Sequence, residues 1–229
     1  MRAPTHPVND EAAAEGREAM VRGQIAARGI RDPAVLEAMR RVPRERFVAA
    51  GLSDRAYDDS PLPIAEGQTI SQPYVVALML EAARLRPGDR MLEVGAGSGY
   101  ACAVASRIAA QVYAIERHAS LAVQARERLA ALGCSNIEIR FGDGSAGWPE
   151  SAPFDAILVS AAGPRVPEPL RQQLAIGGRL VMPVGDALAF QRLVQVTRHS
   201  TNDFSTAELA GVAFVPLIGE HGWAPARQD

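Results

Sequence analysis

A regular alternation of short apolar segments and helical segments after residue 90 constrains the fold more than any other feature of the sequence. Strands are expected at 90–94 (RMLEV), 111–116 (QVYAIE), 137–141 (IEIRF), 154–160 (FDAILVS) and 178–184 (GRLVMPV), and helices at 99–110, 119–132 and 167–174. Strands that alternate with helices pair in parallel and are covered by helices on both faces. The apolar character of these strands agrees with such burial.

The pattern changes after residue 184. The segment 185–190 (GDALAF) is too short for a parallel crossover, which needs about a dozen residues. The strand expected at 191–198 (QRLVQVTR) should therefore run antiparallel to its predecessor, and the polar segment 199–205 turns the chain into a last strand at 208–217. The sequence thus predicts an α/β fold, Rossmann-like and doubly wound, with a mostly parallel seven-stranded sheet that ends in antiparallel C-terminal strands.

Helices and loops are expected before this sheet, with no convincing strand up to Leu85. A short helix from Glu18 to Arg28 stops at Gly29, Asp32-Pro33 starts a second helix, and 43–50 forms a third helical piece. The expected parts are a flexible N-terminal tail (1–17), an N-terminal helical or substrate subdomain (18–85), the domain that holds the sheet (86–219) and a C-terminal tail (220–229).

Composition argues against several classes of protein. Lys+Arg is 24 against Asp+Glu 26, giving a net charge of −2, so no basic surplus points to nucleic acid and no polybasic run to a membrane. No apolar run reaches transmembrane length, and residues 1–17 lack the apolar core of a signal peptide. Cys102 and Cys134 lie in apolar-periodic segments, which is typical of buried, reduced thiols in a cytoplasmic protein.

A glycine-rich loop, LEVGAGSGY, follows the first expected strand of the sheet and opens a helix. Its Gly95, Gly97 and Gly99 allow a tight turn and a close approach of the backbone to a ligand at the carboxyl end of the strand. A dinucleotide fingerprint would require glycine where Tyr100 stands. The loop therefore indicates a nucleoside-type cofactor but fits a dinucleotide poorly.

The next two strand ends carry groups that suit an adenosine cofactor. Glu116 can accept hydrogen bonds from both ribose hydroxyls, and Asp143 can accept from the exocyclic amine of adenine, with Gly142 and Gly144 leaving room for the ring. Each also has a plainer interpretation, Glu116 as a solvated charge and Asp143 as an Asx-turn. With the glycine loop they favour S-adenosylmethionine (SAM) over a nicotinamide dinucleotide, because SAM has no pyrophosphate to cradle.

Beyond these strand ends, the chain resembles the protein-L-isoaspartate O-methyltransferase family of class I SAM-dependent methyltransferases. The segments that carry the resemblance run in the family's order from about Gln24 to Leu217: VLEAMRRVPRERFV, AYDDSPLPIAEGQTISQP, LEVGAGSGY, GDGSAGW, APFDAILVSAA, GGRLVMPVG and FVPL. PLPIAEGQTISQP is the most specific, because methyltransferases in general lack it. Three positions depart from the family's usual residues, with Ala65 in place of Gly and Ala96 and Ser160 in place of Thr, and SAAGPRVPEPL is a looser match.

The resemblance implies which residues form the site. Ser71 of TISQP is implied to lie beside the methyl group and the acceptor carboxylate, as the catalytic residue. Thr69, Ile70 and Val215 would contact the substrate with it. The implied cofactor-binding residues of the SAM-binding domain are Glu93, Gly95, Gly97, Ser98, Gly99, Glu116, Asp143 and Gly144. No metal is expected, since no ligand spacing occurs, and no catalytic role is expected for His6, His118, His199 or His221.

Ser71 also has a purely structural interpretation. Thr69, Ser71 and Gln72 stand just before Pro73, where an apolar helix is expected to begin. Serine is among the preferred N-cap residues, and proline fits the first helical turn. Capping and catalysis do not exclude each other.

The activity implied is methyl transfer from SAM, with S-adenosyl-L-homocysteine as product, to the free carboxylate of L-isoaspartyl residues in damaged proteins and peptides. That carboxylate is ionised at pH 7, so no general base is needed, and a neutral donor such as Ser71 can orient it. The resulting ester cyclises to a succinimide, whose hydrolysis returns part of the damage to normal aspartate, so the function implied is protein repair. The expected protein is a cytoplasmic monomer that binds neither nucleic acid nor membrane.

Three alternatives remain open from the sequence. The scaffold could methylate a different carboxylate, such as one in a dedicated peptide partner, since the SAAGPRVPEPL segment matches loosely. It could bind SAM without catalysis, although the intact TISQP segment argues against this. A nicotinamide dehydrogenase is disfavoured by Tyr100.

Overall fold

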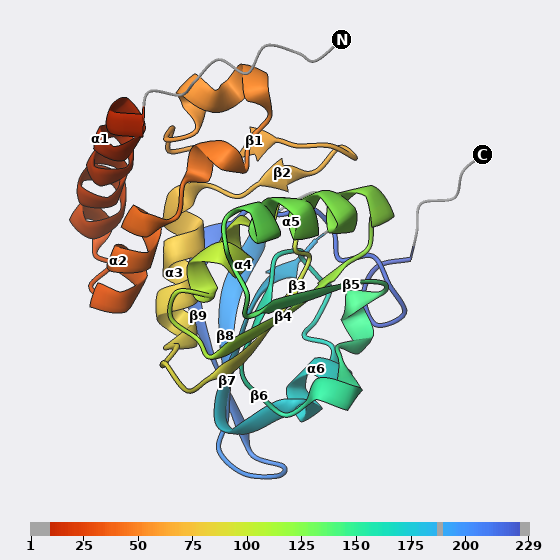
Figure 1. Cartoon of the computed structure of the whole chain (residues 1–229). Coiled ribbons are helices and arrows are strands. Elements are labelled where there is room, and N and C mark those ends of the chain that lie inside the picture. Colours follow the sequence, from red (N-terminus) through yellow and green to blue (C-terminus); the bar gives the residue numbers. More distant parts are fainter. Residues whose placement is uncertain (1–9, 187–189, 225–229) are drawn as a thin grey trace.

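The computed structural model describes residues 10–186 and 190–224, and a seven-stranded sheet forms its centre (Figure 1). The strands are β3 (Arg90–Val94), β4 (Gln111–Glu116), β5 (Ile137–Phe141), β6 (Phe154–Val159), β7 (Leu174–Gly185), β8 (Gln191–Arg198) and β9 (Phe204–Val212). Their order across the sheet is β5-β4-β3-β6-β7-β8-β9. Strands β3 to β7 pair in parallel, whereas β7, β8 and β9 pair antiparallel. The predicted fold class, including its antiparallel end, is confirmed.

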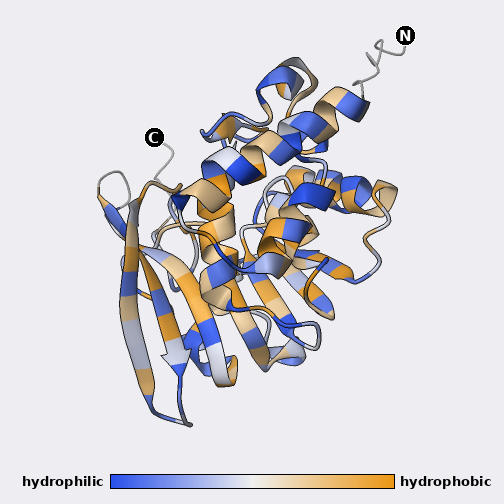
Figure 2. Cartoon of the chain, turned by 90° about the vertical axis from the view of Figure 1, so that its left-hand side faces the viewer, coloured by the Kyte–Doolittle hydropathy of each residue, from blue (hydrophilic) through white to orange (hydrophobic). Residues whose placement is uncertain are grey.

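Helices cover both faces of this sheet. They are α1 (Asp10–Met20), α2 (Pro33–Arg41), α3 (Pro73–Ala83), α4 (Tyr100–Ala105), α5 (Ala119–Ala131) and α6 (Glu168–Gln172). One cluster of buried residues joins α1 to α5 with one face of the sheet, and a second cluster joins α6 with the other face. Hydrophobic residues concentrate where the helices meet the strands (Figure 2). The N-terminal helices therefore share one core with the sheet rather than forming a core of their own.

The N-terminal helix begins earlier than the sequence analysis predicted. Helix α1 starts at Asp10 instead of Glu18, so residues 10–17 of the expected tail are helical, while residues 1–9 lie outside the described part of the chain. Its alanine-rich start favours a helix, since alanine has the highest helix propensity. Arg17 then anchors it through an ion pair of 2.9 Å with the buried Glu45. A π-helical turn (Val21–Ile25) and a 3₁₀ turn (Ala26–Arg28) carry the helix to Gly29, which ends it as expected with φ of 106°.

A small hairpin before Leu85 was not predicted. Strands β1 (Leu62–Pro63) and β2 (Thr69–Ile70) pair antiparallel, so the expectation of no strand in this region is wrong. The third helical piece, expected at 43–50, is two 3₁₀ segments, Arg44–Arg46 and Ala50–Arg55. The remaining short turns are Gly144–Ala146 and Pro149–Ser151. Strand β2 contains the first two residues of the TISQP segment, and Ile70 is buried in the core that the N-terminal helices share with the sheet.

The C-terminal end also differs from the prediction. Strand β9 begins at Phe204, inside the expected turn, and ends at Val212, after which the chain leaves the sheet. Part of the expected C-terminal tail is packed, because the indole Nε1 of Trp223 donates to the carbonyl of Ala162 at 3.1 Å. The backbone amide of Glu220 likewise donates to Asp143 at 2.8 Å.

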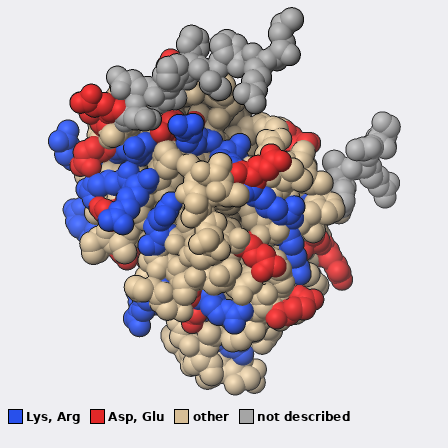
Figure 3. All heavy atoms as spheres, in the orientation of Figure 1, with Lys and Arg blue, Asp and Glu red and all other residues tan. Residues whose placement is uncertain are grey.

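Charged side chains cover the surface over α1 and α2 (Figure 3). The blue side chains there are all arginines, since the sequence contains no lysine. Several are paired, such as Arg40 with Glu18 at 2.8 Å and Arg41 with Glu37 at 2.7 Å. Among the described residues, no helix is long and apolar enough to cross a membrane.

Two helices start with proline in their first turn but are capped differently. The Asp32 side chain accepts hydrogen bonds from the amides of Ala34 and Val35 at the start of α2. Helix α3 has Gln72 at its N-cap and no side-chain cap, so the interpretation of Ser71 as a cap is wrong. The Ser71 carbonyl instead accepts a hydrogen bond of 2.8 Å from the Arg44 guanidinium.

This difference predicts different costs for two substitutions. Asp32→Ala should lower the free energy of unfolding by about 1 kcal/mol, because an N-cap is lost. Ser71→Ala should change it by less than about 0.5 kcal/mol, because no cap is removed. Urea unfolding of both variants beside the wild type measures the two values. A Ser71→Ala loss equal to that of Asp32→Ala would show that the Ser71 hydroxyl caps α3 in solution.

Candidate active site

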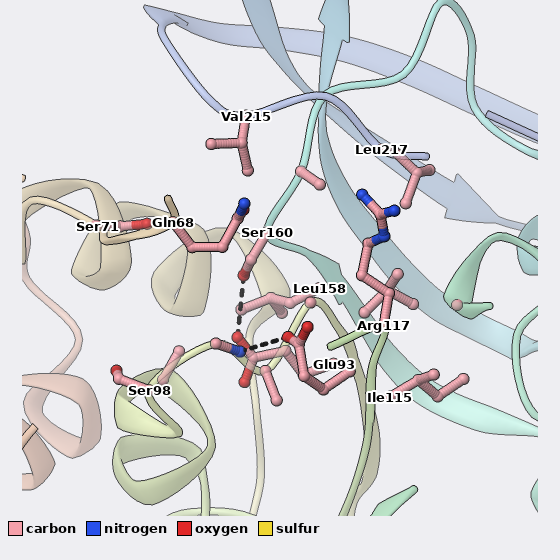
Figure 4. Close-up of a pocket in the computed structure, with 18 of the residues that line it drawn as sticks. Gln68, Ser71, Glu93, Ser98, Ile115, Arg117, Leu158, Ser160, Val215 and Leu217 are labelled. Carbon is pink, nitrogen blue, oxygen red and sulfur yellow. Dashed lines mark hydrogen bonds between the residues drawn. The ribbon is translucent and has the colours of Figure 1, made fainter. Parts of the chain in front are cut away.

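A cavity lies at the carboxyl ends of β3, β4 and β6, where the strand order changes direction. The chain runs outward from β3 through β4 to β5 and then returns to place β6 on the other side of β3. Ligands of open α/β sheets bind at such a switch point. The cavity is also lined by residues 69–71 of the TISQP segment and by residues 215–218 near the C-terminal end of the described chain. Figure 4 shows Ser71 and Gln68 on one side of the cavity and Arg117 and Ile115 on the other.

The glycine loop has the backbone conformation that its sequence predicts. Gly95, Gly97 and Gly99 have φ of 88°, 53° and 87°, a region that side chains other than glycine rarely adopt. The amide of Gly95 donates to the Ile115 carbonyl at 2.8 Å, which ties the loop to the end of β4. The loop thus presents backbone rather than side chains to the cavity, and Ser98 lines it as well.

Glu116 lines the cavity at the end of β4 and is almost completely buried. One carboxylate oxygen accepts from the Gly97 amide at 2.8 Å and the other accepts from the His118 amide at 2.8 Å. Among the described residues, no cation forms an ion pair with it. A buried carboxylate without a cationic partner needs further hydrogen bonds, and each oxygen retains acceptor capacity. Two ribose hydroxyls would supply them.

Glu93, at the end of β3, forms a buried polar cluster with two neighbours. The Ser160 hydroxyl donates to one oxygen at 2.9 Å (Figure 4), and the Cys102 thiol donates to the other at 2.7 Å. Burial raises the pKa of Glu93 to about 7, although both hydrogen bonds act in the opposite direction. Glu93 therefore lines the cavity as a carboxyl group that changes charge near neutral pH.

Asp143 does not line the cavity, whereas Gly144 does. Its carboxylate accepts from the Ser145 amide and from the Glu220 amide, both at 2.8 Å. Burial raises the pKa of this carboxyl, but the hydrogen bonds from Glu220 and Ser145 outweigh it and hold the pKa below its usual value. The geometry is thus that of an Asx-turn tied to the C-terminal segment, and contact with adenine stays a prediction. A Cβ on Gly144 would lie 2.5 Å from Val94, so only glycine fits there.

Ser71 lies half-buried where two hollows meet. With Thr69, Ser160 and Val215 it lines both the cavity at the strand ends and an adjoining groove. Ile70 lines the cavity as well. The structure therefore brings together the predicted cofactor and substrate residues other than Asp143 and Gly99. Gly99 lies behind the loop, where a Cβ would be 3.2 Å from Leu129.

Several lining residues were not predicted from the sequence. His118, for which no catalytic role was expected, lines the cavity, and its buried Nε2 has no hydrogen-bond partner among the described residues. Gln68 and Arg117 line the cavity too. The sequence signal that could have identified Arg117 and His118 as lining residues is their position directly after Glu116. No sequence signal marks Gln68 apart from its place beside Thr69. His199 and His221 do not line the cavity, and His6 lies outside the described residues.

The residues present fit an adenosine cofactor. Each oxygen of the buried Glu116 carboxylate has one amide donor and capacity for another, which ribose hydroxyls would use. His118, whose buried Nε2 has no partner among the described residues, lines the same cavity. No group of three or more possible metal ligands occurs within residues 10–186 and 190–224. The lining mixes apolar side chains with a few polar groups, as is usual for small-molecule sites.

Comparisons with known proteins agree on one family. The family model described as protein-L-isoaspartate(D-aspartate) O-methyltransferase (PCMT) matches residues 15–222. Protein-L-isoaspartate O-methyltransferase 1 of Rhodopseudomonas palustris (strain HaA2) is 59% identical over 97% of this chain and 92% of its own length. The protein-L-isoaspartate O-methyltransferase of Methylorubrum extorquens (strain PA1) is also 59% identical, over 97% of this chain and 96% of its own.

Solved structures agree with these relatives. A protein-L-isoaspartate O-methyltransferase superposes with a TM-score of 0.81 at 29% identity, over 90% of this chain and 67% of that one. A Plasmodium falciparum protein described as a beta-aspartate methyltransferase (PCMT) superposes with a TM-score of 0.76 at 27% identity, over 88% of this chain and 98% of that one. It was solved in complex with S-adenosyl-L-homocysteine.

The raised pKa of Glu93 predicts a pH dependence of stability. The carboxyl has a pKa of 4.5 when unfolded and about 7 when folded, so between these values the folded protein holds a proton that the unfolded chain has released. The contribution of Glu93 to the free energy of unfolding should therefore fall as the pH rises from about 4.5 to about 7, by up to about 3 kcal/mol.

Glu93→Gln isolates this contribution, because its amide does not titrate. Urea unfolding at several pH values should give a steeper loss of stability with rising pH for the wild type than for Glu93→Gln. Parallel pH profiles for the two proteins would contradict the prediction.

Proposed function

Because the chain belongs to the protein-L-isoaspartate(D-aspartate) O-methyltransferase family, we propose that the cavity holds SAM and that the adjoining groove holds the acceptor residue, with Ser71 between them. The protein is a SAM-dependent methyltransferase that methylates the free carboxylate of L-isoaspartyl residues and so starts their repair through a succinimide. The observation that carries the assignment of roles is that Ser71 lines both hollows.

The cofactor supplies a methyl group on a positively charged sulfur. In our proposal Glu116 would accept from the ribose hydroxyls, and the backbone of the glycine loop at Gly95 and Gly97 would lie against the amino-acid part of the cofactor. Ser98 and Gly144 would complete the surface around it, and Gly99 would act by giving the loop its conformation. Glu93 also lines the cavity, and the positive charge on the sulfur of a bound cofactor would favour the ionised form of its carboxyl.

Positioning, rather than proton transfer, is the work of the protein in this reaction. An isoaspartyl carboxylate is already ionised at pH 7, so no general base has to activate it. The Ser71 hydroxyl would donate a hydrogen bond that orients the carboxylate, and a neutral donor stabilises the nucleophile less than a cation would. Thr69, Ile70 and Val215 would hold the backbone of the substrate around it. Holding the reacting atoms in line removes much of the entropic barrier.

We further propose which part of the chain binds the substrate, which part binds SAM, and in which compartment the protein works. Residues 18–85 would bind substrate, 86–219 would bind SAM, and the protein would work as a cytoplasmic monomer without nucleic acid or membrane. The two free cysteines and the net charge of −2 support the cytoplasm and the lack of nucleic acid. Sedimentation would test the monomer.

Acceptor specificity tests the function. A normal aspartyl residue places its carboxylate one methylene away from the isoaspartyl position, and a misplacement of about 1 Å can cost around a hundredfold in rate. Labelled methyl transfer from SAM should therefore be at least about a hundredfold faster to an isoaspartyl peptide than to the matched aspartyl peptide. Comparable rates would favour the alternative, a carboxyl methyltransferase with a different or dedicated peptide acceptor.

The role of Ser71 is tested by kinetics and binding on the same variant. Ser71→Ala should turn over at least about tenfold more slowly, a loss of about 1.4 kcal/mol in transition-state stabilisation, while its SAM affinity stays near that of the wild type. Glu116→Ala is the matched control, since it should weaken SAM binding by about 1.5–3 kcal/mol. A fully active Ser71→Ala enzyme would shift the role to the Thr69 hydroxyl or to nearby backbone amides.

A further inference from the structure

The groove that adjoins the cofactor cavity at Ser71 is also lined by the aromatic ring of Phe190. It has a volume of about 470 Å³ and runs between the TISQP segment and the chain around β8 and β9. Among its described lining residues none is charged, and beyond Ser71 the lining is largely apolar, with Val75, Val212 and Phe190. An apolar groove that continues from the reacting centre is suited to a neighbouring part of the same substrate.

Phe190 is the unusual member of this lining. It is 66% exposed, among the most exposed large hydrophobic residues of the described chain. Two described residues lie close to its ring. A Cβ on Gly211 would lie 3.3 Å from the ring, so the lack of a side chain there lets Phe190 lie against β9. The Arg192 guanidinium lies 5.2 Å from the ring centre.

Contacts of the next two residues, Gln191 and Arg192, hold the chain beside Phe190 in place. The buried Gln191 side chain donates to the Phe214 carbonyl at 3.0 Å and accepts from the Phe214 amide at 2.7 Å. Arg192 is held by an ion pair of 2.7 Å with Glu208 on the adjacent strand. The residue that follows Phe190 is therefore tied to the segment after β9, and a preorganised aromatic surface binds at a lower entropic cost than a mobile one.

On the basis of the function given above, we propose that Phe190 binds an apolar side chain of a residue close in sequence to the isoaspartyl residue. The reacting carboxylate lies at Ser71, so the substrate chain that carries it must leave along one of the open directions, and the groove to Phe190 is one of them. No described lining residue is charged, and the charge of Arg192 beside the ring is paired with Glu208, so the groove suits an aliphatic or aromatic side chain. Phe190 is thus a specificity-determining residue of the methyl transfer.

The test uses peptides in which the isoaspartyl residue is flanked by glycines, and variants in which one flanking glycine at a time is replaced by leucine. At one flanking position the wild type should prefer leucine by about three- to tenfold in kcat/KM, mainly through KM, because the side chain leaves water. Phe190→Ala should reduce this preference to less than about twofold, and Phe190→Leu should keep most of it. Ile176→Ala, which removes a comparably exposed apolar side chain (68%) from β7, is the matched control and should keep the preference.

Three results would overturn the role of Phe190. The first is an equal leucine preference in the wild type and Phe190→Ala, and the second is no leucine preference in the wild type. The third is sedimentation that shows a wild-type dimer and a Phe190→Ala monomer, since the ring would then bind a second copy of the chain. All three differ from failure of the function itself, in which no isoaspartyl peptide would accept a methyl group from the wild type.

Discussion

The guanidinium of Arg44 connects three parts of the chain on which the site depends: the N-terminal segment at Ala56, the TISQP segment at Ser71 and the start of α4 at Tyr100. It is completely buried and donates to the carbonyls of Ala56 and Ser71, each at 2.8 Å. Its plane lies over the Tyr100 ring, which opens α4 directly behind the glycine loop. Burial lowers the pKa of this group, and no ion pair with a carboxylate forms among the described residues. Carbonyl dipoles and an aromatic face therefore stabilise the charge, which makes the position of Ser71 depend on the N-terminal helices and on the cofactor loop together.

Much of the sheet could be predicted, because its periodicity is local. The bounds of β4, β5 and β8 are those expected, and the short segment after β7 correctly indicated an antiparallel partner. The errors lie where local sequence competes with packing. The alanine-rich start of α1 favours a helix, but its docking depends on Arg17, which reaches Glu45 across 28 positions, a contact that no local pattern reveals.

The candidate site divides in the same way. Residues that act through the backbone or at a strand end, such as Gly97 and Glu116, were predictable from spacing, since parallel strands end at one edge of the sheet. Residues defined by long-range packing were not. Asp143 matched the expected position at a strand end, yet the packed C-terminal segment occupies its carboxylate through Glu220. Phe190 had no expected role, because only the pairing of β8 with β9 brings its ring over Gly211.

At none of the three positions that depart from the family's usual residues does the described geometry require the usual residue. Ala96 contributes to the loop through its backbone, since its amide donates to Ile115 and its carbonyl accepts from Gly99. Ser160 keeps a hydroxyl, and that hydroxyl is the group that donates to Glu93. Ala65 precedes the two residues of its turn that have positive φ, Glu66 and Gly67, and is not itself among them. An alanine there needs no left-handed conformation, so it stiffens the hairpin loop without strain. The hairpin that this loop closes carries Thr69 and leads directly to Ser71, so a stiffer loop favours a fixed position for the hydroxyl.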